Sequence, residues 1–362
     1  MPTKLVFGDG ASERLAESVP VYGSRPLLVT DHTLAQLPLI RALLSTLPEA
    51  PWFVDVEPNP RVSNVDALAT VLRTNGHDVV VAVGGGSAMD CAKAASYLAT
   101  TEEPSIRPFH TEGKPVGSTR LPLIVVPTTG TGSEVTPFAV LTDARKGIKK
   151  TLTADVFYPS LALVDPLLTH TMPKALTAAT AFDALTHAIE GYWSRNHQPT
   201  CDLFAKEAAC LIFGNLENVL DDPDDAGSRR AMAYASTLAG MAFQLPRNAM
   251  VHACSYPLTR RHGLAHGVAC AFTLEAAIRI NAPYMGGRME AFATYCGFSD
   301  LSVMIERIRG LKCLGGLPCT LREAGIPRSD VEAIIDESFD PKMGNNPKGI
   351  TRRDLQDMYR EL

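Results

Sequence analysis

The chain has 362 residues, of which 46% are hydrophobic and 20% charged, and its formal net charge is -5. A single core rarely grows beyond about 250–300 residues, so two domains are expected. The charges are spread along the chain, which argues against a nucleic acid or a membrane as partner. The opening residues, MPTKLVFGDGASERL, lack the basic start and apolar core of a signal peptide. The eight cysteines form no C-x-x-C pair, as expected of reduced thiols. We therefore expect a cytoplasmic protein.

Short β-branched runs alternate with helical stretches over residues 1–169. The runs expected to form strands are RPLLVTD, WFVDVEP, DVVVAVGGGS, LPLIVVPTT and LALVDP. Strands that alternate with helices predict a parallel α/β sheet that binds its ligand at the C-terminal ends of the strands. Residues 1–169 are therefore expected to form a dinucleotide-binding domain.

Two loops in this domain have the composition of phosphate sites. Gly84-Gly85-Gly86-Ser87 follows an apolar strand and precedes the helical stretch SAMDCAKAASYLA. Backbone N–H groups at such a helix start can approach a pyrophosphate, although an ordinary tight turn has the same glycines. The second loop, PTTGTGSE from 127 to 134, offers the hydroxyls of Thr128 and Thr129 to the same ligand.

Asp31 ends the first predicted strand, in LLVTD. A carboxylate in this place can accept hydrogen bonds from a ribose and repel a 2′-phosphate, so the residue favours NAD(H) over NADP(H). A helix N-cap is the alternative role for the same side chain.

The character of the chain changes near residues 171–173. From there on the stretches TAATAFDALTHAIEGYW, RRAMAYASTLAGMAF, TLEAAIRIN and DLSVMIERIRGL show helical, Ala/Leu-rich periodicity. Residues 170–362 are therefore expected to form an all-helical domain.

Four residues of the helical part are typical of one metal site. Asp183 and His187 are four apart, so on a helix both side chains leave the same face. His252 and His266 are separated by a stretch with a proline and a glycine, which predicts a helix, a turn and a second element that folds back. One carboxylate and three imidazoles suit Fe(II), or alternatively Zn(II), with a position open for substrate. Taken alone, an Asp/His pair at helical spacing is more often a solvated surface pair, and a lone histidine such as His252 is more often a hydrogen-bonded core residue.

Together these motifs resemble the iron-containing (group III) alcohol dehydrogenases along nearly the whole chain. The resemblance rests on GGGSxxDxxK from 84 to 93, PTTGTGSE, DALTHAIE and H-x13-H-G. It implies a dehydroquinate synthase-like two-domain fold, a homodimer, and aldehyde reduction with NAD(P)H. It assigns the metal to Asp183, His187, His252 and His266. It assigns cofactor contacts to Gly85, Gly86, Ser87, Asp90, Thr128, Thr129, Thr136, Val140 and Lys149.

The chain departs from the family pattern at two places. Thr129 adjoins Gly130, where the family has one residue more, which changes the cofactor contacts expected there. Tyr256 occupies a place where the family commonly has a histidine proposed to relay protons, so Tyr256 joins His252 and His266 as a catalytic candidate. The words HACSYPLT, WSRNH and DPKMGNNPK resemble the subgroup of phosphonoacetaldehyde reductases.

The predicted reaction is the metal-dependent reduction of a small aldehyde, specifically phosphonoacetaldehyde to 2-hydroxyethylphosphonate in phosphonate natural-product biosynthesis. The side chains expected to hold the phosphonate are Arg195, Asn196, His197 and Lys342, with solvated surface charge as the alternative. A general short-chain alcohol dehydrogenase or lactaldehyde-type reductase is the alternative function, and a dehydroquinate synthase-like lyase is more remote. A nucleotide sensor and a maleylacetate reductase are disfavoured, because all four metal ligands are present.

Overall fold

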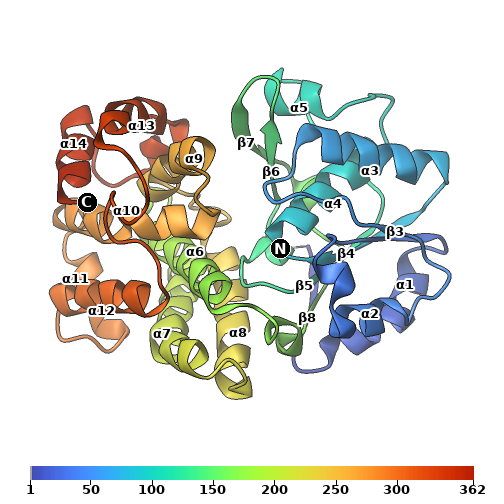
Figure 1. Ribbon diagram of the computed structural model, residues 1–362, viewed down its shortest axis with the longest axis horizontal. Helices are drawn as coiled ribbons and strands as arrows, with labels where there is room; N and C mark the ends of the chain where they lie inside the picture. Colours follow the sequence, from blue (N-terminus) through green and yellow to red (C-terminus); the bar gives the residue numbers. More distant parts are fainter. Residues whose placement is uncertain (1) are drawn as a thin grey trace. The chain divides into compact units, whose positions relative to one another are not determined.

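The computed structural model describes residues 2–362, and they divide between Thr171 and Met172 into two compact units. The first unit is built on a six-stranded sheet with the order β1-β8-β5-β4-β2-β3, in which every pair is parallel (Figure 1). Its strands are β1 (Lys4–Phe7), β2 (Pro26–Val29), β3 (Trp52–Phe53), β4 (Val79–Gly84), β5 (Leu123–Pro127) and β8 (Leu161–Val164).

The sheet is buried on both faces. Its helices are α1 (Leu15–Tyr22), α2 (Pro38–Leu44), α3 (Val62–Thr74), α4 (Gly86–Leu98) and α5 (Arg107–Thr111). In β4, Val80 and Ala82 pack in one core with residues of α3 and α4, while Val79, Val81 and Val83 pack in another core with α1 and α2. Strands buried on both faces have continuous apolar sequences, which explains why these runs were detectable.

Three strands of this unit were not predicted. β1 adds the parallel edge strand beside β8, and β6 (Phe138–Asp143) forms an antiparallel hairpin with β7 (Ile148–Thr153). β7, with the sequence IKKTLT, is mostly polar and buries only Leu152, so its sequence resembles a loop. In the predicted strand 52–58 only Trp52 and Phe53 pair with β2.

The second unit, residues 172–362, contains only helical regular elements (Figure 1). These are α6 (Lys174–Trp193), α7 (Pro199–Asp221), α8 (Ala226–Phe243), α9 (Met250–His262), α10 (His266–Asn281), α11 (Arg288–Tyr295), α12 (Leu301–Leu314), α13 (Val331–Ser338) and α14 (Arg352–Glu361), with short 3₁₀ turns between some of them. The fold class predicted from the sequence is confirmed. Among the residues that the structure describes, none of the helices has the length and apolar character needed to span a bilayer.

The turn between α9 and α10 lies at Gly263. α9 continues through Pro257 to His262, and the chain reverses at Gly263, which has a φ of 69°. A left-handed residue directly after a helix is usually glycine because it has no Cβ to clash. The predicted helix, turn and second element are therefore present, and the glycine rather than the proline makes the turn.

Helices α6 and α10 approach each other at Gly267. A Cβ placed on Gly267 would lie 1.9 Å from the backbone oxygen of Ala179. Ala179 is one turn before Asp183 on α6, and Gly267 follows His266 at the start of α10. The missing side chain at Gly267 thus lets these two metal-ligand candidates lie close together.

We expect Gly267→Ala to destabilise the helical unit by about 3 kcal/mol, because the new methyl group meets backbone that cannot rotate away. The midpoint of urea unfolding, followed by circular dichroism, measures the effect. Gly310→Ala is the matched control: Gly310 lies inside α12 with open space around it, and alanine there should stabilise the helix by about 0.5–1 kcal/mol. Equal stability of the Gly267 variant and wild type would show that α6 and α10 do not depend on this contact.

Candidate functional site

The four predicted metal ligands lie together in the helical unit. Asp183 and His187 come from the middle of α6, His252 from the first turn of α9, and His266 is the first residue of α10. The Nε2 atoms of His187, His252 and His266 lie 3.9, 3.8 and 3.6 Å from Asp183 Oδ1. Ligand atoms that share one Zn(II)-like ion at 2.0–2.1 Å are roughly 3.3 Å apart, so the observed spacing is close to that of a common ion.

The burial of the donors also fits a metal ion. The side chain of His252 is 1% exposed, and its Nε2 has no hydrogen-bond partner among the described residues. A buried polar atom without a partner is costly, and a metal ion at this point would remove the cost. These residues therefore fit a divalent ion.

His187 is held as a neutral imidazole. Its ring stacks on Phe243 with centroids 4.1 Å apart and on His252 at 4.7 Å. Burial, together with the nearby His252, lowers the pKa of His187 well below its usual value. A neutral imidazole keeps the lone pair that a metal ligand needs.

Glu190 positions His252, and sequence reasoning did not single it out. Its Oε2 lies 2.7 Å from His252 Nδ1, and the carboxylate also accepts from the backbone N–H groups of Ala249 at 2.9 Å and Val251 at 2.6 Å. With Nδ1–H donating to Glu190, the Nε2 lone pair of His252 is directed toward Asp183. Glu190 ends the word DALTHAIE seven residues after Asp183, on the same helix face, so the spacing contained the signal.

The surroundings of His252 also make metal binding sensitive to pH. Burial opposes its protonation, but the neighbouring Cys270 and the Glu190 carboxylate raise the pKa of His252 well above its usual value. A proton on His252 competes with a metal ion for the same nitrogen, so metal affinity should fall as the pH decreases.

Cys270 lies beside the four ligands and was not predicted. Asp183, His252, His266 and Cys270 each offer a donor atom, and these atoms all lie within 4.8 Å of one another. Burial raises the pKa of the Cys270 thiol, although His252 acts in the opposite direction. The signal was again a spacing of four residues, from His266 to Cys270 on α10.

The two predicted phosphate loops touch each other in the α/β unit. α4 begins at Gly86, directly after β4, with Gly85 as its N-cap. A Cβ on Gly85 would lie 2.8 Å from Thr129 Oγ1, and one on Gly86 would lie 3.3 Å from Thr131 Oγ1. Side chains at either glycine would therefore close the approach to the N-terminus of α4.

Buried hydroxyls line the second loop. The Oγ1 atoms of Thr128 and Thr131 are buried and have no hydrogen-bond partner among the described residues. Thr128 is anchored by its N–H, which donates to Gly84 O at 3.1 Å. Free backbone N–H groups at a helix start, beside buried hydroxyls, fit a dinucleotide phosphate.

Asp90 and Lys93 hold the second loop and β6 in place; the sequence analysis named Lys93 only as the end of the motif GGGSxxDxxK and gave it no role. The Asp90 carboxylate is buried and accepts from Ser133 Oγ and Val140 N, both at 3.0 Å. Lys93 Nζ donates to the backbone oxygens of Ser133 at 2.6 Å and Thr136 at 3.0 Å. Burial lowers the pKa of Lys93 to about 8 and raises that of Asp90. The contacts of Asp90, Thr136 and Val140 therefore support the loop.

The remaining cofactor candidates have partners within the unit. Asp31 Oδ1 accepts from Leu34 N at 2.9 Å, at the start of the short 3₁₀ turn Leu34–Gln36, whose N-cap position is Thr33 and not Asp31. Ser87 Oγ accepts from Asn59 N at 3.2 Å, and Lys149 Nζ donates to Asn59 Oδ1 at 2.8 Å. Contacts of Asp31, Ser87 and Lys149 with a cofactor stay a prediction.

Two of the four substrate candidates fix a neighbouring segment, and a third pairs with a carboxylate of α7. The Arg195 N–H donates to Asn345 O at 2.8 Å, and Asn196 Nδ2 donates to Asn345 Oδ1 at 3.1 Å. His197 Nδ1 lies 3.0 Å from Asp202 Oδ2. Asn345 ends the 3₁₀ turn Pro341–Asn345, so Arg195 and Asn196 fix this turn, and direct contact with a substrate stays a prediction.

Lys342, the fourth candidate, lies over Tyr256. Its Nζ is 4.5 Å from the Tyr256 ring centroid and 3.3 Å from Asp340 Oδ1. The Tyr256 ring is in turn 6.2 Å from the ring of His266. Burial opposes protonation, but Tyr256 and Asp340 raise the pKa of Lys342, so its ammonium stays charged at neutral pH. The structure thus brings Lys342 and Tyr256 beside one proposed metal ligand.

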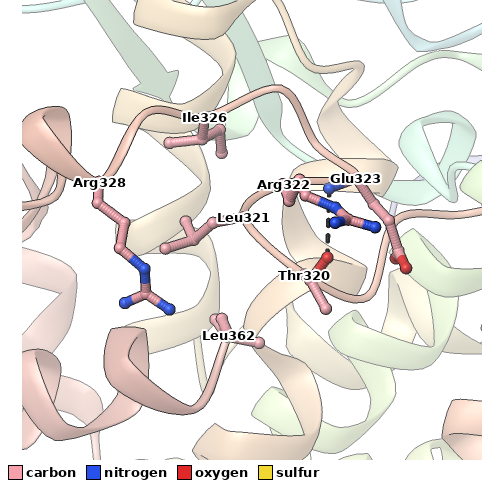
Figure 2. Close-up of a pocket in the computed structure, with 7 residues that line it drawn as sticks. All are labelled: Thr320, Leu321, Arg322, Glu323, Ile326, Arg328 and Leu362. Carbon is pink, nitrogen blue, oxygen red and sulfur yellow. Dashed lines mark hydrogen bonds between the residues drawn. The ribbon is translucent and has the colours of Figure 1, made fainter.

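A separate hollow of the helical unit lies at the C-terminus of the chain (Figure 2). Its lining residues are Thr320, Leu321, Arg322, Glu323, Ile326, Arg328 and Leu362. The Glu323 N–H donates to Thr320 Oγ1 at 3.2 Å across one side of it. No residue predicted for metal, cofactor or substrate is among these lining residues, so the hollow is not part of the candidate site.

We expect Glu190→Gln to weaken metal binding roughly 10- to 100-fold, because the neutral amide orients His252 less firmly. Titration of chelator-stripped protein against a chromophoric chelator measures the affinity. Glu275→Gln serves as the control: Glu275 is a largely buried acid on α10 that pairs with Lys312 at 2.9 Å, so its loss should leave the affinity unchanged. Equal affinities in the Glu190 variant and wild type would contradict the role of Glu190.

Comparison with known proteins identifies the family. The sequence model of iron-containing alcohol dehydrogenases matches residues 2–166, and the C-terminal model of the same family matches residues 177–362. Lactaldehyde reductase of Escherichia coli (strain K12) is 32% identical, over 98% of this chain and 96% of that protein. Sulfoacetaldehyde reductase of Bilophila wadsworthia (strain 3_1_6) is 31% identical, over 96% and 94%.

Solved structures agree. The crystal structure of sulfoacetaldehyde reductase from Bifidobacterium kashiwanohense in complex with NAD+ has a TM-score of 0.94 and 39% identity, covering 99% of this chain and 96% of that one. A 1,3-propanediol oxidoreductase structure has a TM-score of 0.93 and 32% identity, over 99% and 97%. The resemblance drawn from the motifs is confirmed: the chain belongs to the iron-containing alcohol dehydrogenase family of enzymes.

Proposed function

We propose that this enzyme reduces a two-carbon aldehyde that carries an anionic group, with phosphonoacetaldehyde as the best candidate and 2-hydroxyethylphosphonate as the product. The observation that carries the proposal is the position of the Lys342 ammonium over Tyr256, beside His266. A charged donor over the ring that neighbours His266 suits an aldehyde whose anion is only two carbons from the carbonyl oxygen.

The cofactors would supply the reactive chemistry. A divalent ion held by Asp183, His187, His252 and His266 would polarise the carbonyl oxygen, and reduced nicotinamide would deliver the hydride. Fe(II) is the proposed ion, with Zn(II) as the alternative, and NADH the proposed reductant. Glu190 keeps His252 in the tautomer that such an ion requires.

The chain itself orients the substrate and handles the proton. Lys342 is held between Asp340 and the Tyr256 ring, so its charge is placed before the substrate arrives. The Tyr256 hydroxyl is the proposed proton donor to the product alcohol, in the place where the family commonly has histidine. Arg195 and Asn196 support this arrangement by fixing Asn345 in the segment of Lys342.

Two of the relatives support an anionic substrate. They are named sulfoacetaldehyde reductases, and a sulfonate resembles a phosphonate in size and in its charged oxygens. A second candidate function is the reduction of an uncharged short-chain aldehyde, because lactaldehyde reductase and 1,3-propanediol dehydrogenases match the chain over similar lengths. We also propose that the enzyme is a homodimer.

Steady-state rates with NADH and NADPH test the proposal across phosphonoacetaldehyde, sulfoacetaldehyde, lactaldehyde, succinic semialdehyde and butyraldehyde. We expect the highest kcat/KM for phosphonoacetaldehyde. A preference for sulfoacetaldehyde would keep the anionic class and change the acid group. A preference for an uncharged aldehyde would remove the proposal.

We expect Lys342→Ala to lower kcat/KM for phosphonoacetaldehyde roughly ten- to a hundred-fold, because a charge-assisted contact contributes about 1.5–3 kcal/mol. The rate with butyraldehyde should hardly change. Lys348→Ala is the matched control: Lys348 belongs to the same segment but pairs with Asp354, so both substrates should keep their rates. Equal losses for both aldehydes in the Lys342 variant would assign Lys342 a purely structural role.

Asp31→Ser should raise the use of NADPH relative to NADH, since it removes a charge that repels the 2′-phosphate. A serine hydroxyl can also accept from the Leu34 N–H, so this local contact is kept and a change in cofactor use does not come from a changed fold. The ratio of kcat/KM for the two cofactors is the readout. An unchanged ratio would limit Asp31 to its contact with Leu34 N.

A further inference from the structure

Two helices of the metal centre each present a pair of donors with the same spacing. Asp183 and His187 lie one turn apart on α6, and His266 and Cys270 lie one turn apart on α10. Residues four apart on a helix share a face, so Cys270 faces the same side as the ligand candidate His266. Cys270 is therefore a further donor beside Asp183, His252 and His266, and its sulfur lies within 4.8 Å of the donor atoms of all three.

The distances suit coordination by sulfur. Cys270 Sγ lies 4.0 Å from His266 Nε2. A nitrogen at 2.0–2.1 Å and a sulfur at 2.3 Å from one five-coordinate ion are roughly 3.1–3.8 Å apart, so the observed distance is only slightly longer than coordination requires. Cys270 is fully buried. His252, whose buried Nε2 has no hydrogen-bond partner among the described residues, belongs to the same group of donors within 4.8 Å.

We propose that Cys270 is an additional ligand of the metal ion, and that its sulfur shifts the preference of the centre from Fe(II) toward Zn(II) and Co(II). On binding, the S–H bond breaks, a sulfur–metal bond forms and the proton leaves to solvent, without oxidation or reduction. The inference rests on the metal site of the proposed function.

Sulfur changes both the charge and the softness of the centre. Asp183 and a Cys270 thiolate together would balance the charge of a divalent ion, whereas Asp183 alone leaves one positive charge. Thiolates select softer ions such as Zn(II), while carboxylate and imidazole discriminate less between Zn(II) and Fe(II). Metal identity in this enzyme would then depend on one residue outside the four-ligand set.

Cys254 is a buried thiol near the metal centre that lies outside the group of donor atoms. It is as buried as Cys270 and lies on α9, two residues after His252. Its interactions are with Ser338 and Tyr359, and it is absent from the group of donor atoms. Cys254→Ser is therefore a matched control for the removal of a buried thiol near the centre.

Cobalt spectroscopy of the full-length enzyme tests the ligand directly. Chelator-stripped protein is reloaded with one equivalent of Co(II) without oxygen, and the near-ultraviolet spectrum is recorded. We expect an intense sulfur-to-cobalt charge-transfer band in wild type and in Cys254→Ser, and its loss in Cys270→Ser and Cys270→Ala. Serine has almost the shape of cysteine, so it carries the test if the alanine variant does not fold.

Metal competition tests the consequence. Stripped protein is offered equal amounts of Fe(II) and Zn(II), and the bound metals are counted by mass spectrometry. The ratio of zinc to iron should fall roughly 10- to 100-fold in Cys270→Ser relative to wild type and Cys254→Ser.

Failure of this inference differs from failure of the proposed function. The sulfur ligand is overturned, and the metal site remains, if wild type binds one Co(II) that the His266→Ala variant does not bind, but wild type shows no charge-transfer band. The same conclusion follows if the band persists in Cys270→Ala. An unchanged zinc-to-iron ratio in Cys270→Ser overturns the claim on metal preference. If wild type binds no metal, the proposed function itself fails.

Discussion

The close contact of α6 and α10 is the constraint on which the metal centre depends. Gly267 lets the start of α10 approach the backbone of Ala179, and each of these residues is next to or one turn from a proposed ligand. Two helices with pairs of donors four residues apart converge only if their axes come this close. His252 then needs only the short α9 and the reversal at Gly263 to reach the same point.

Buried charged groups organise both units in the same way. Glu190 accepts from two backbone N–H groups and from His252, and Lys93 donates to backbone oxygens of the loop and strand that follow β5. A buried charge is tolerated when its hydrogen bonds are satisfied, and removal of one partner leaves an uncompensated charge. Glu190 and Lys93 therefore each stay buried only because their hydrogen bonds are made, and these bonds hold neighbouring ligand-facing residues in one position.

Features with a regular period were predictable from the sequence, and features that depend on tertiary contacts were not. The spacing of Asp183 and His187 and the apolar runs of the parallel sheet follow from the periods of helix and strand. The hairpin of β6 and β7 was missed because its second strand, IKKTLT, is mostly polar and buries only Leu152, so it resembles a loop. Glu190 and Cys270 lie on the same helix faces as predicted ligands, seven residues after Asp183 and four after His266. Spacing alone does not show whether such a side chain contacts a ligand or packs in the core.

Lys342 shows how a single lysine can be positioned to recognise an anionic substrate. Alone it is a lysine near the C-terminus, and its sequence distance from His266 is large. The turn Pro341–Asn345 is tied to the end of α6 by Arg195 and Asn196, and the buried Asn346 bonds to Asn281 of α10. These bonds fix the position of the Lys342 backbone, and Tyr256 and Asp340 then limit its side chain. Because both the backbone and the side chain of Lys342 are held, its ammonium loses little conformational entropy when an anion binds. This favours binding of a charged aldehyde over an uncharged one.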